Sequence, residues 1–295
     1  EILRCLVGSE MCIRDRTYID ALVQTASTYQ EHRACIQMIE RVTLDKVILI
    51  ADRGYENYNI MSHAIEKGWK FLIRIKDVHS NGIASGLELP QTAVFDMDIN
   101  LILTRNQTKS KKQAGYKFMP TVQTFDYLPI GSKEDYPISF RIARFKIADD
   151  SYETVITNLD RFCFSAEKLK ELYHLRWGIE TSFRELKYAI GLTSFHAKKV
   201  DYIKQEIFAR LALYNYCELI TTYVVEHTEN ISKKNQVNFT IAIYICREYL
   251  RRKRKLRPPD VVKLIEKHIL PIRPGRRDPR KVKPQASVSF LYRVA

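Results

Sequence analysis

Four polar residues on one predicted helix are of the types that bind metal ions and phosphates. Tyr173, Arg176, Glu180 and Lys187 are separated by three, four and seven residues. At about 100° per residue they fall within an arc of roughly 60°, beside the apolar stripe of the helix. The same four residues could also form an ordinary helix border with a supportive Arg176–Glu180 pair. Features elsewhere in the chain distinguish a metal- and phosphate-binding set from an ordinary polar helix border.

The element that must position this set is a long helix over residues 165–191. Ser165 can cap its start, and Gly191 suits the left-handed position just past its end. No proline interrupts the segment, which predicts one helix of about seven turns. Its apolar residues follow helical rather than alternating spacing and are Leu169, Leu172, Ile179, Phe183, Leu186 and Ile190.

A second candidate acid follows a predicted strand. Residues 46–51 form a nearly continuous apolar run, typical of a central strand buried on both faces, and Asp52 comes directly after it. Asp52 lies where α/β sheets bind ligands, although an Asp-Arg-Gly sequence also suits a turn. The neighbouring elements alternate and predict an α/β layer with parallel pairing in its later strands: strand 17–24, helix 28–41, helix 57–67 and strand 69–76.

Residues 77–164 change character and predict an antiparallel β insertion. Four strand-like segments are separated by Gly, Pro, Asn and Asp turns: 94–104, 118–124, 138–146 and 152–157. The loop 105–117 contains Arg105, Lys111, Lys112 and Lys117, a basic tip suited to phosphate contact.

The C-terminal part of the chain is predicted to be helical and strongly basic. Helices are expected at about 202–226, 237–250 and 259–269, and a dense positive run over 247–257 includes Arg252 and Arg254. Lysine plus arginine total 48 against 34 acidic residues, a formal charge of +14. This excess indicates a polyanionic partner, most often nucleic acid.

Several classes of protein are disfavoured. No apolar run is long enough to span a bilayer, and no secretory signal is evident. The six cysteines form neither a CxxC pair nor a zinc spacing, which indicates reduced thiols in a cytoplasmic protein. Residues 1–16 lack either periodicity, and residues 11–16 resemble a translated adaptor sequence, so we expect the native frame to begin near Thr17.

Taken together, these features resemble the DDE transposases of bacterial insertion sequences. The resemblance rests on the strand that ends in Asp-Arg-Gly-Tyr, on the β-rich insertion, and on the signature Tyr-x2-Arg-x3-Glu-x6-Lys. It implies a ribonuclease H-like α/β core whose first strands, and first catalytic aspartate, are missing from this N-terminally truncated chain. The implied organisation is a non-native segment 1–16, a first core part 17–76, a β insertion 77–164, a catalytic helix 165–191 and a basic helical region 192–295.

The resemblance also implies a chemistry. Asp52 and Glu180 would be two of three catalytic carboxylates, holding two Mg²⁺ ions, with Mn²⁺ as an alternative, for phosphodiester cleavage and strand transfer. Arg176 and Lys187 would contact phosphates of the transposon end, and Tyr173 would donate its hydroxyl. Trp177 would either stack on an unpaired base or pack within the protein.

The implied partners are double-stranded DNA, as terminal repeats and as target, and a second protomer when two ends are paired. The protein would then be cytoplasmic and associated with the nucleoid. Two other functions stay open: a catalytically inert remnant that still binds DNA ends, and a ribonuclease H-like nuclease that cuts without strand transfer.

Overall fold

The computed structural model describes residues 6–12, 16–24, 29–78, 80–192, 194–228, 235–253, 257–272 and 289–290. The chain divides into two compact units. The sheet unit comprises Gln30–Arg176, and the helical unit combines Glu1–Tyr29 with Trp177–Ala295. The boundary between them therefore falls inside the predicted helix 165–191.

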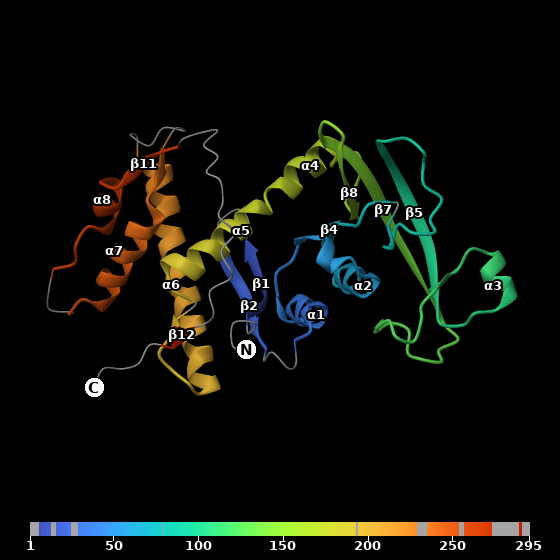
Figure 1. Ribbon diagram of the computed structural model, residues 1–295, viewed down its shortest axis with the longest axis horizontal. Helices are drawn as coiled ribbons and strands as arrows, with labels where there is room; N and C mark the ends of the chain where they lie inside the picture. Colours follow the sequence, from blue (N-terminus) through green and yellow to red (C-terminus); the bar gives the residue numbers. More distant parts are fainter. Residues whose placement is uncertain are drawn as a thin grey trace. The chain divides into compact units, whose positions relative to one another are not determined.

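The sheet unit is built on one six-stranded mixed sheet with the order β3-β4-β8-β7-β5-β6 (Figure 1). β3 and β4 pair in parallel, β4-β8-β7-β5 are antiparallel neighbours, and β6 is parallel to β5. The strands are β3 (Ile48–Ala51), β4 (Lys70–Arg74), β5 (Phe95–Thr104), β6 (Lys117–Phe118), β7 (Asp135–Ala148) and β8 (Ser151–Thr157). The helices are α1 (Glu31–Arg41), a 3-10 turn (Arg53–Tyr55), α2 (Tyr58–Glu66), α3 (Lys109–Gln113) and α4 (Ala166–His174).

The centre of this sheet is β4, which is buried on both faces. Phe71 and Ile73 pack into the cluster that contains the apolar residues of α1 and α2, whereas Leu72 packs into the cluster that contains α4. This alternation follows from the period of two along a strand. The prediction that residues 46–51 form the central buried strand is wrong: among the described strands β3 pairs only with β4, and Ile48 to Ile50 are half-buried.

The predicted β insertion contains strands at nearly the expected places but is no separate layer. Because β8 pairs directly with β4, the strands of residues 77–164 continue the sheet that β3 and β4 begin. The segment predicted over 118–124 contributes only Lys117–Phe118, since Pro120 lacks the N–H that a longer ladder needs. The loop 105–117 holds the short α3, capped by the Thr108 hydroxyl.

The helical unit combines helices with three small strand pairs. Its two clusters of buried residues contain Tyr18, Leu186 and Tyr214 in one and Cys217, Val224 and Ile243 in the other. The helices are α5 (Trp177–Arg184), a π-helical turn (Glu185–Ala189), α6 (Val200–His227), α7 (Phe239–Arg251) and α8 (Val261–Glu266). The strands are β1 (Leu6–Cys12) with β2 (Thr17–Val23), β9 (Ser194–Phe195) with β12 (Ser289–Phe290), and β10 (Asn235–Val237) with β11 (Ile269–Pro271).

The first two strands differ from expectation. β2 was expected to belong to the α/β layer, but it pairs antiparallel with β1 in a two-stranded sheet of its own. Residues 1–16 were expected to stand outside the fold, yet they contribute β1 and Arg16. A strand can form here without a period in its side chains because β1 is held by backbone hydrogen bonds to β2.

The predicted helix 165–191 is interrupted twice. Ser165 caps α4 through its hydroxyl, and Gly191 adopts the expected left-handed conformation with φ of 84°. Between α4 and α5 the bonds Leu175 N–H to Leu172 O and Arg176 N–H to Tyr173 O tighten the chain into a 3-10 turn. After Glu185 the helix widens into the π-turn, so the advance of 100° per residue that placed Lys187 in one arc with Tyr173 does not apply there.

None of the described helices is both long enough and apolar enough to cross a bilayer.

Candidate active site

Asp52 lies directly after β3 and is exposed. One carboxylate oxygen accepts a hydrogen bond of 2.8 Å from the Gly54 N–H and thereby caps the 3-10 turn. The other oxygen has no hydrogen-bond partner among the described residues. The side chain thus forms the turn contact that an Asp-Arg-Gly sequence favours and still presents an oxygen ligand to solvent.

Two contacts hold the turn that follows Asp52 against α1. A ring nitrogen of His32 lies 2.6 Å from Gly54 O, and the Tyr55 hydroxyl donates to Glu31 at 2.8 Å. Burial, with Glu31 nearby, raises the pKa of Tyr55, so its hydroxyl stays a donor. These contacts fasten the turn to α1 and restrict where Asp52 can point.

Tyr173 and Arg176 lie together in the sheet unit. Tyr173 is 3% exposed and packs with Leu72 and Val155 against the sheet, and the Arg176 guanidinium carbon lies 5.6 Å from its ring centroid. The buried hydroxyl has no hydrogen-bond partner among the described residues, and burial raises its pKa although the nearby Arg176 and Arg74 act in the opposite direction. The hydroxyl that was expected to reach DNA is therefore covered in this structure, and the ring supports Arg176.

Glu180, Trp177 and Lys187 belong to the helical unit. On α5, Glu180 is exposed and Trp177 is 55% exposed, whereas Lys187 is half-buried in the π-turn. The opposite side of α5 is anchored to β2, where the Ser182 and Tyr18 hydroxyls lie 2.8 Å apart. This anchoring leaves a carboxylate and an indole facing solvent, and such groups could bind a metal ion and stack on a base.

A buried cluster of charged residues in the helical unit was missed from the sequence. Arg16 lies 2.8 Å from a Glu185 carboxylate oxygen and 3.1 Å from Glu218, and the Tyr214 hydroxyl donates to Glu218 at 2.7 Å. Burial raises the pKa of both glutamates, although Arg16 opposes the shift. The signal was present in α6, where Glu218 lies one residue after buried Cys217 and three before buried Thr221. The cluster ties the π-turn to α6.

Two basic residues of the loop 105–117, Arg105 and Lys111, bind other groups of the protein. The Arg105 guanidinium donates to the carbonyls of Leu128, Met119, Pro120 and Gln123, so it holds the loop together rather than projecting from it. Lys111 forms an ion pair with Asp135. Lys112 is exposed and remains a predicted phosphate contact.

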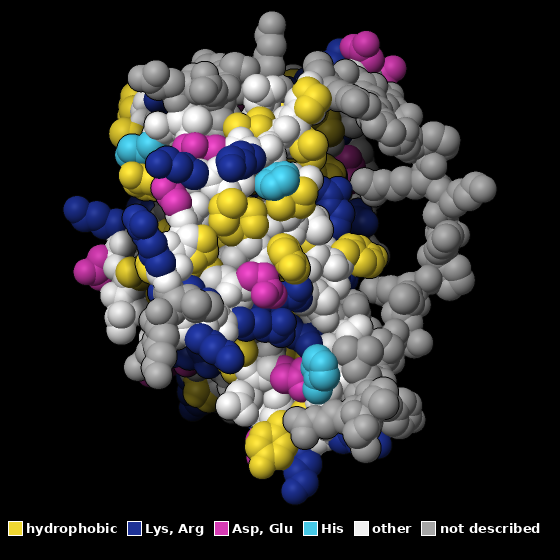
Figure 2. Space-filling model, turned by 90° about the vertical axis from the view of Figure 1, so that its left-hand side faces the viewer, with side chains coloured by type: hydrophobic (Ala, Val, Ile, Leu, Met, Phe, Trp, Pro, Cys, Tyr) yellow, Lys and Arg dark blue, Asp and Glu magenta, His cyan; other side chains and the backbone are white. Residues whose placement is uncertain are grey.

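The C-terminal basic residues are described in part. Arg252 is half-buried and stacks over the Tyr249 ring at 4.8 Å, and Arg254 lies outside the described residues. Figure 2 looks onto the side that α7 and α8 form, where lysine and arginine side chains are spread among hydrophobic ones. This distribution suits contact with a polyanion without defining a single binding groove.

The residues present fit a hard divalent cation by their chemistry. Asp52 and Glu180 are exposed carboxylates, and Mg²⁺ is commonly held by only one or two carboxylates together with water and substrate phosphates. Within the described parts of the chain, no three His, Cys, Asp or Glu side chains form a ready-made metal cluster. The two acids belong to different units, Asp52 to the sheet unit and Glu180 to the helical unit.

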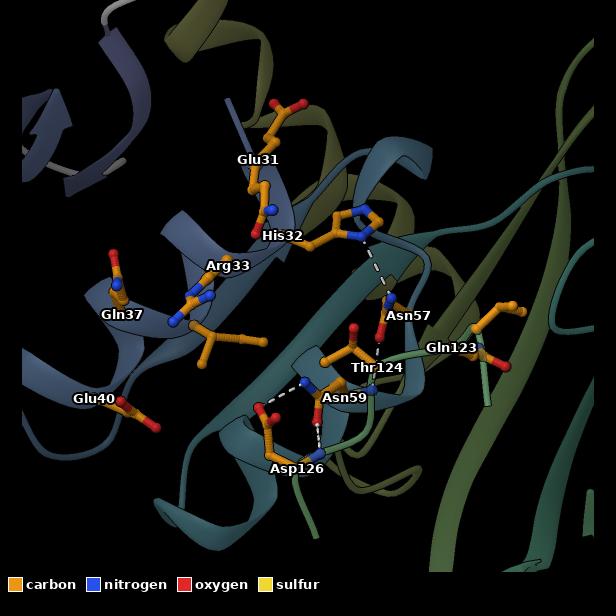
Figure 3. A pocket seen from close by; sticks show the side chains of 13 residues that line it. Glu31, His32, Arg33, Gln37, Glu40, Asn57, Asn59, Gln123, Thr124 and Asp126 are labelled. Carbon is orange, nitrogen blue, oxygen red and sulfur yellow. Dashed lines mark hydrogen bonds between the residues drawn. The ribbon is translucent and has the colours of Figure 1, made fainter. Parts of the chain in front are cut away.

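The surface of the sheet unit is hollowed beside α1. One cavity has a volume of about 760 Å³ and lies between α1, the start of α2 and residues 122–126 (Figure 3). There Asn59 and Asp126 exchange two hydrogen bonds of 2.8 and 2.9 Å, and His32 and Asn57 approach each other from α1 and the turn before α2.

Comparison with known proteins agrees with the sequence resemblance. A probable transposase for the insertion sequence element IS5377 from Geobacillus stearothermophilus is 23% identical over 178 residues, which cover 59% of this chain and 40% of that protein. A putative transposase InsL for IS186A from Escherichia coli (strain K12), and the transposase for IS421 from Escherichia coli, are each 39% identical over 57 residues. Those segments cover 19% of this chain and 15% of each relative, so the chain matches well under two thirds of these proteins' lengths. A sequence model of the Transposase DDE domain matches residues 12–216, more than half of the chain, and the chain therefore belongs to this family.

Proposed function

We propose that this protein is a DNA transposase that cleaves the ends of an insertion sequence and joins them to target DNA. The observation that carries the proposal is the family match over residues 12–216, which includes Asp52 and the whole Tyr-Arg-Glu-Lys signature. Both carboxylates within that match are exposed, as residues that contact a large substrate must be. The strongly basic composition supports a DNA substrate.

The proposed roles follow from what each side chain can do. Asp52 and Glu180 would hold Mg²⁺, or Mn²⁺, which when bound activates an oxygen nucleophile and stabilises charge on the attacking and leaving oxygens. Arg176 and Lys187 would bind phosphates beside the cleaved bond. Tyr173 would act indirectly, because its buried ring supports the Arg176 guanidinium.

The proposed partners are duplex DNA and a second copy of the chain. Transposition needs two ends held together, and one protomer on each end would supply the required pair of sites. Exposed Trp177 could stack on a base that is unpaired near the cleaved bond. Such a protein would work in the bacterial cytoplasm, on the nucleoid.

The test is a nicking and joining assay with duplexes that carry the terminal repeats flanking the gene in its source genome. With two of the three implied carboxylates present, we expect weak Mg²⁺-dependent nicking and joining by the unchanged chain, and loss of both in Glu180→Gln and Asp52→Asn. Glu171→Gln is the matched control, since Glu171 is an exposed glutamate of α4 outside the signature.

Other outcomes would identify the alternatives. Specific binding of the duplex without nicking in Mg²⁺ or Mn²⁺ would indicate an inert DNA-end-binding protein. Nicking without any joined product would indicate a nuclease of the same fold class. Nicking that persists in Glu180→Gln would refute the role of that carboxylate.

A further inference from the structure

A second cavity of the sheet unit, of about 640 Å³, adjoins the Asp52 turn. It lies between that turn, residues 76–83 and β6. Its volume is in the range of about 300–1,000 Å³ that small-molecule sites occupy. The lining residues that matter here are His32, Arg53, Glu56, Lys76, Lys117 and Gln123.

Three cations converge on this cavity from distant parts of the chain, and each has hydrogen-bond donors to spare. The Lys76 ammonium donates to Asn81 O at 3.2 Å, and the Lys117 ammonium donates to Ser85 O at 3.3 Å. A lysine has three such donors, so each retains two. Arg53 is exposed, and its guanidinium has no ion-pair or hydrogen-bond partner in the described part of the chain.

The carboxylate in the lining, that of Glu56, accepts hydrogen bonds from two backbone N–H groups. One of its oxygens accepts the Lys76 N–H at 2.8 Å, and the other accepts the Ile83 N–H. A Cβ at Gly82 would overlap this carboxylate, so glycine is needed for the approach. Glu56 therefore fixes the wall of the cavity, and the lining keeps three cations against one carboxylate.

Towards the Asp52 turn, Arg53 and Lys76 also line a smaller cavity of about 140 Å³ at the C-terminal end of β4. Arg74, Asp77 and Glu153 line it as well, and Arg74 forms an ion pair of 3.3 Å with Glu153. On the other side, His32 and Gln123 are shared with the cavity of Figure 3. That cavity is lined by three carboxylates, Glu31, Glu40 and Asp126, against one arginine, Arg33, and is less suited to an anion.

We propose that Arg53, Lys76 and Lys117 bind backbone phosphates of a DNA strand that leads to Asp52. The proposal rests on the proposed function and adds a contact surface outside the Tyr-Arg-Glu-Lys helix. Lysine and arginine side chains with free donors are the groups that contact phosphate without reading sequence. Residues 53, 76 and 117 would hold the strand beside the exposed carboxylate of Asp52, which directly precedes Arg53 in the chain.

The test measures binding of a fluorescent terminal-repeat duplex by anisotropy at a series of salt concentrations. Each phosphate contact contributes a slope of about 0.9 to log Kd against log salt, so fourfold more salt weakens binding by about 3.5-fold per contact. Lys76→Ala should reduce the salt response by that factor, and Arg53→Ala/Lys76→Ala/Lys117→Ala by about 40-fold. Lys168→Ala is the matched control, because Lys168 is exposed on α4 and likewise donates to one carbonyl, that of Cys163.

The outcomes separate this proposal from the proposed function. Reduced slopes in the variants, with an unchanged slope in Lys168→Ala and in the charge-preserving Lys76→Arg, would support the cavity. Binding with the full slope in the triple variant would overturn the cavity assignment and leave the transposase proposal intact. Failure of the unchanged chain to bind any duplex would overturn both. Buried Trp69 provides the folding check, since its fluorescence reports whether the variants retain the sheet unit.

Discussion

The burial of Tyr173 makes a prediction that separates a core residue from a DNA contact. Tyr173→Phe removes only the hydroxyl, which is buried and has no hydrogen-bond partner in the described part of the chain. A buried polar group without a partner costs about 1–3 kcal/mol, so its removal should leave the unfolding free energy unchanged or raise it by about 1 kcal/mol. Tyr173→Ala also removes a ring that packs against Leu72, Val155 and Leu169, and should lower it by about 3–5 kcal/mol.

The assay uses the two tryptophans of the chain, Trp69 and Trp177. In a Trp177→Phe background only Trp69 remains, which is 2% exposed and donates its indole N–H to Leu44 O at 3.0 Å. Its fluorescence during urea unfolding therefore reports on the sheet unit alone. Anisotropy with the terminal-repeat duplex gives the DNA affinity of the same variants.

We expect Tyr173→Phe to keep both its stability and its affinity for DNA. A loss of affinity at unchanged stability would refute the reasoning, because the hydroxyl would then contact DNA in the bound state. A loss of more than about 1 kcal/mol of unfolding free energy would show instead that the hydroxyl has a partner. Tyr173→Ala serves as the positive control for the stability measurement.

Two further predictions concern charged groups away from the proposed ligands. Arg105→Ala should lower the unfolding free energy by about 2–4 kcal/mol, because four carbonyls lose a charged donor. The salt slope of DNA binding should stay unchanged, and a reduced slope would show that Arg105 contacts phosphate after all. Because burial raises the pKa of Glu185 and Glu218 above the usual 4.5, the folded state binds more protons than the unfolded state between that value and their folded pKa. The contribution of these two carboxyls to the unfolding free energy should therefore grow as pH falls towards 4.5, and the Glu218→Gln variant should lack its share of that growth; an identical pH dependence in urea titrations of the two proteins would contradict this.

The sequence by itself determined the family and most of the elements. Helical and alternating periodicities are local properties, so α6, α7, β5, β7 and β8 were predicted close to their observed bounds. The position of Asp52 after a strand and the Ser165 and Gly191 ends of the signature helix were predicted for the same reason, and the structure confirms them. The resemblance to DDE transposases needed only the spacing of residues within that helix and the strand, and the family match confirms it.

The tertiary structure decided what each element contacts. Which strand becomes central depends on its partners, so only the pairing of β4 with both β3 and β8 showed that β4 is buried on two faces. Burial of Tyr173 and the inward turn of Arg105 likewise depend on distant segments that cover them. The cavity beside Asp52 also depends on the tertiary structure. Residues 53, 76 and 117 line it together, although 64 positions (117 − 53) separate the first from the last in the sequence. Local propensity does not predict contacts between residues that are distant in sequence, because these contacts form only when the sheet brings the loops at its edge together.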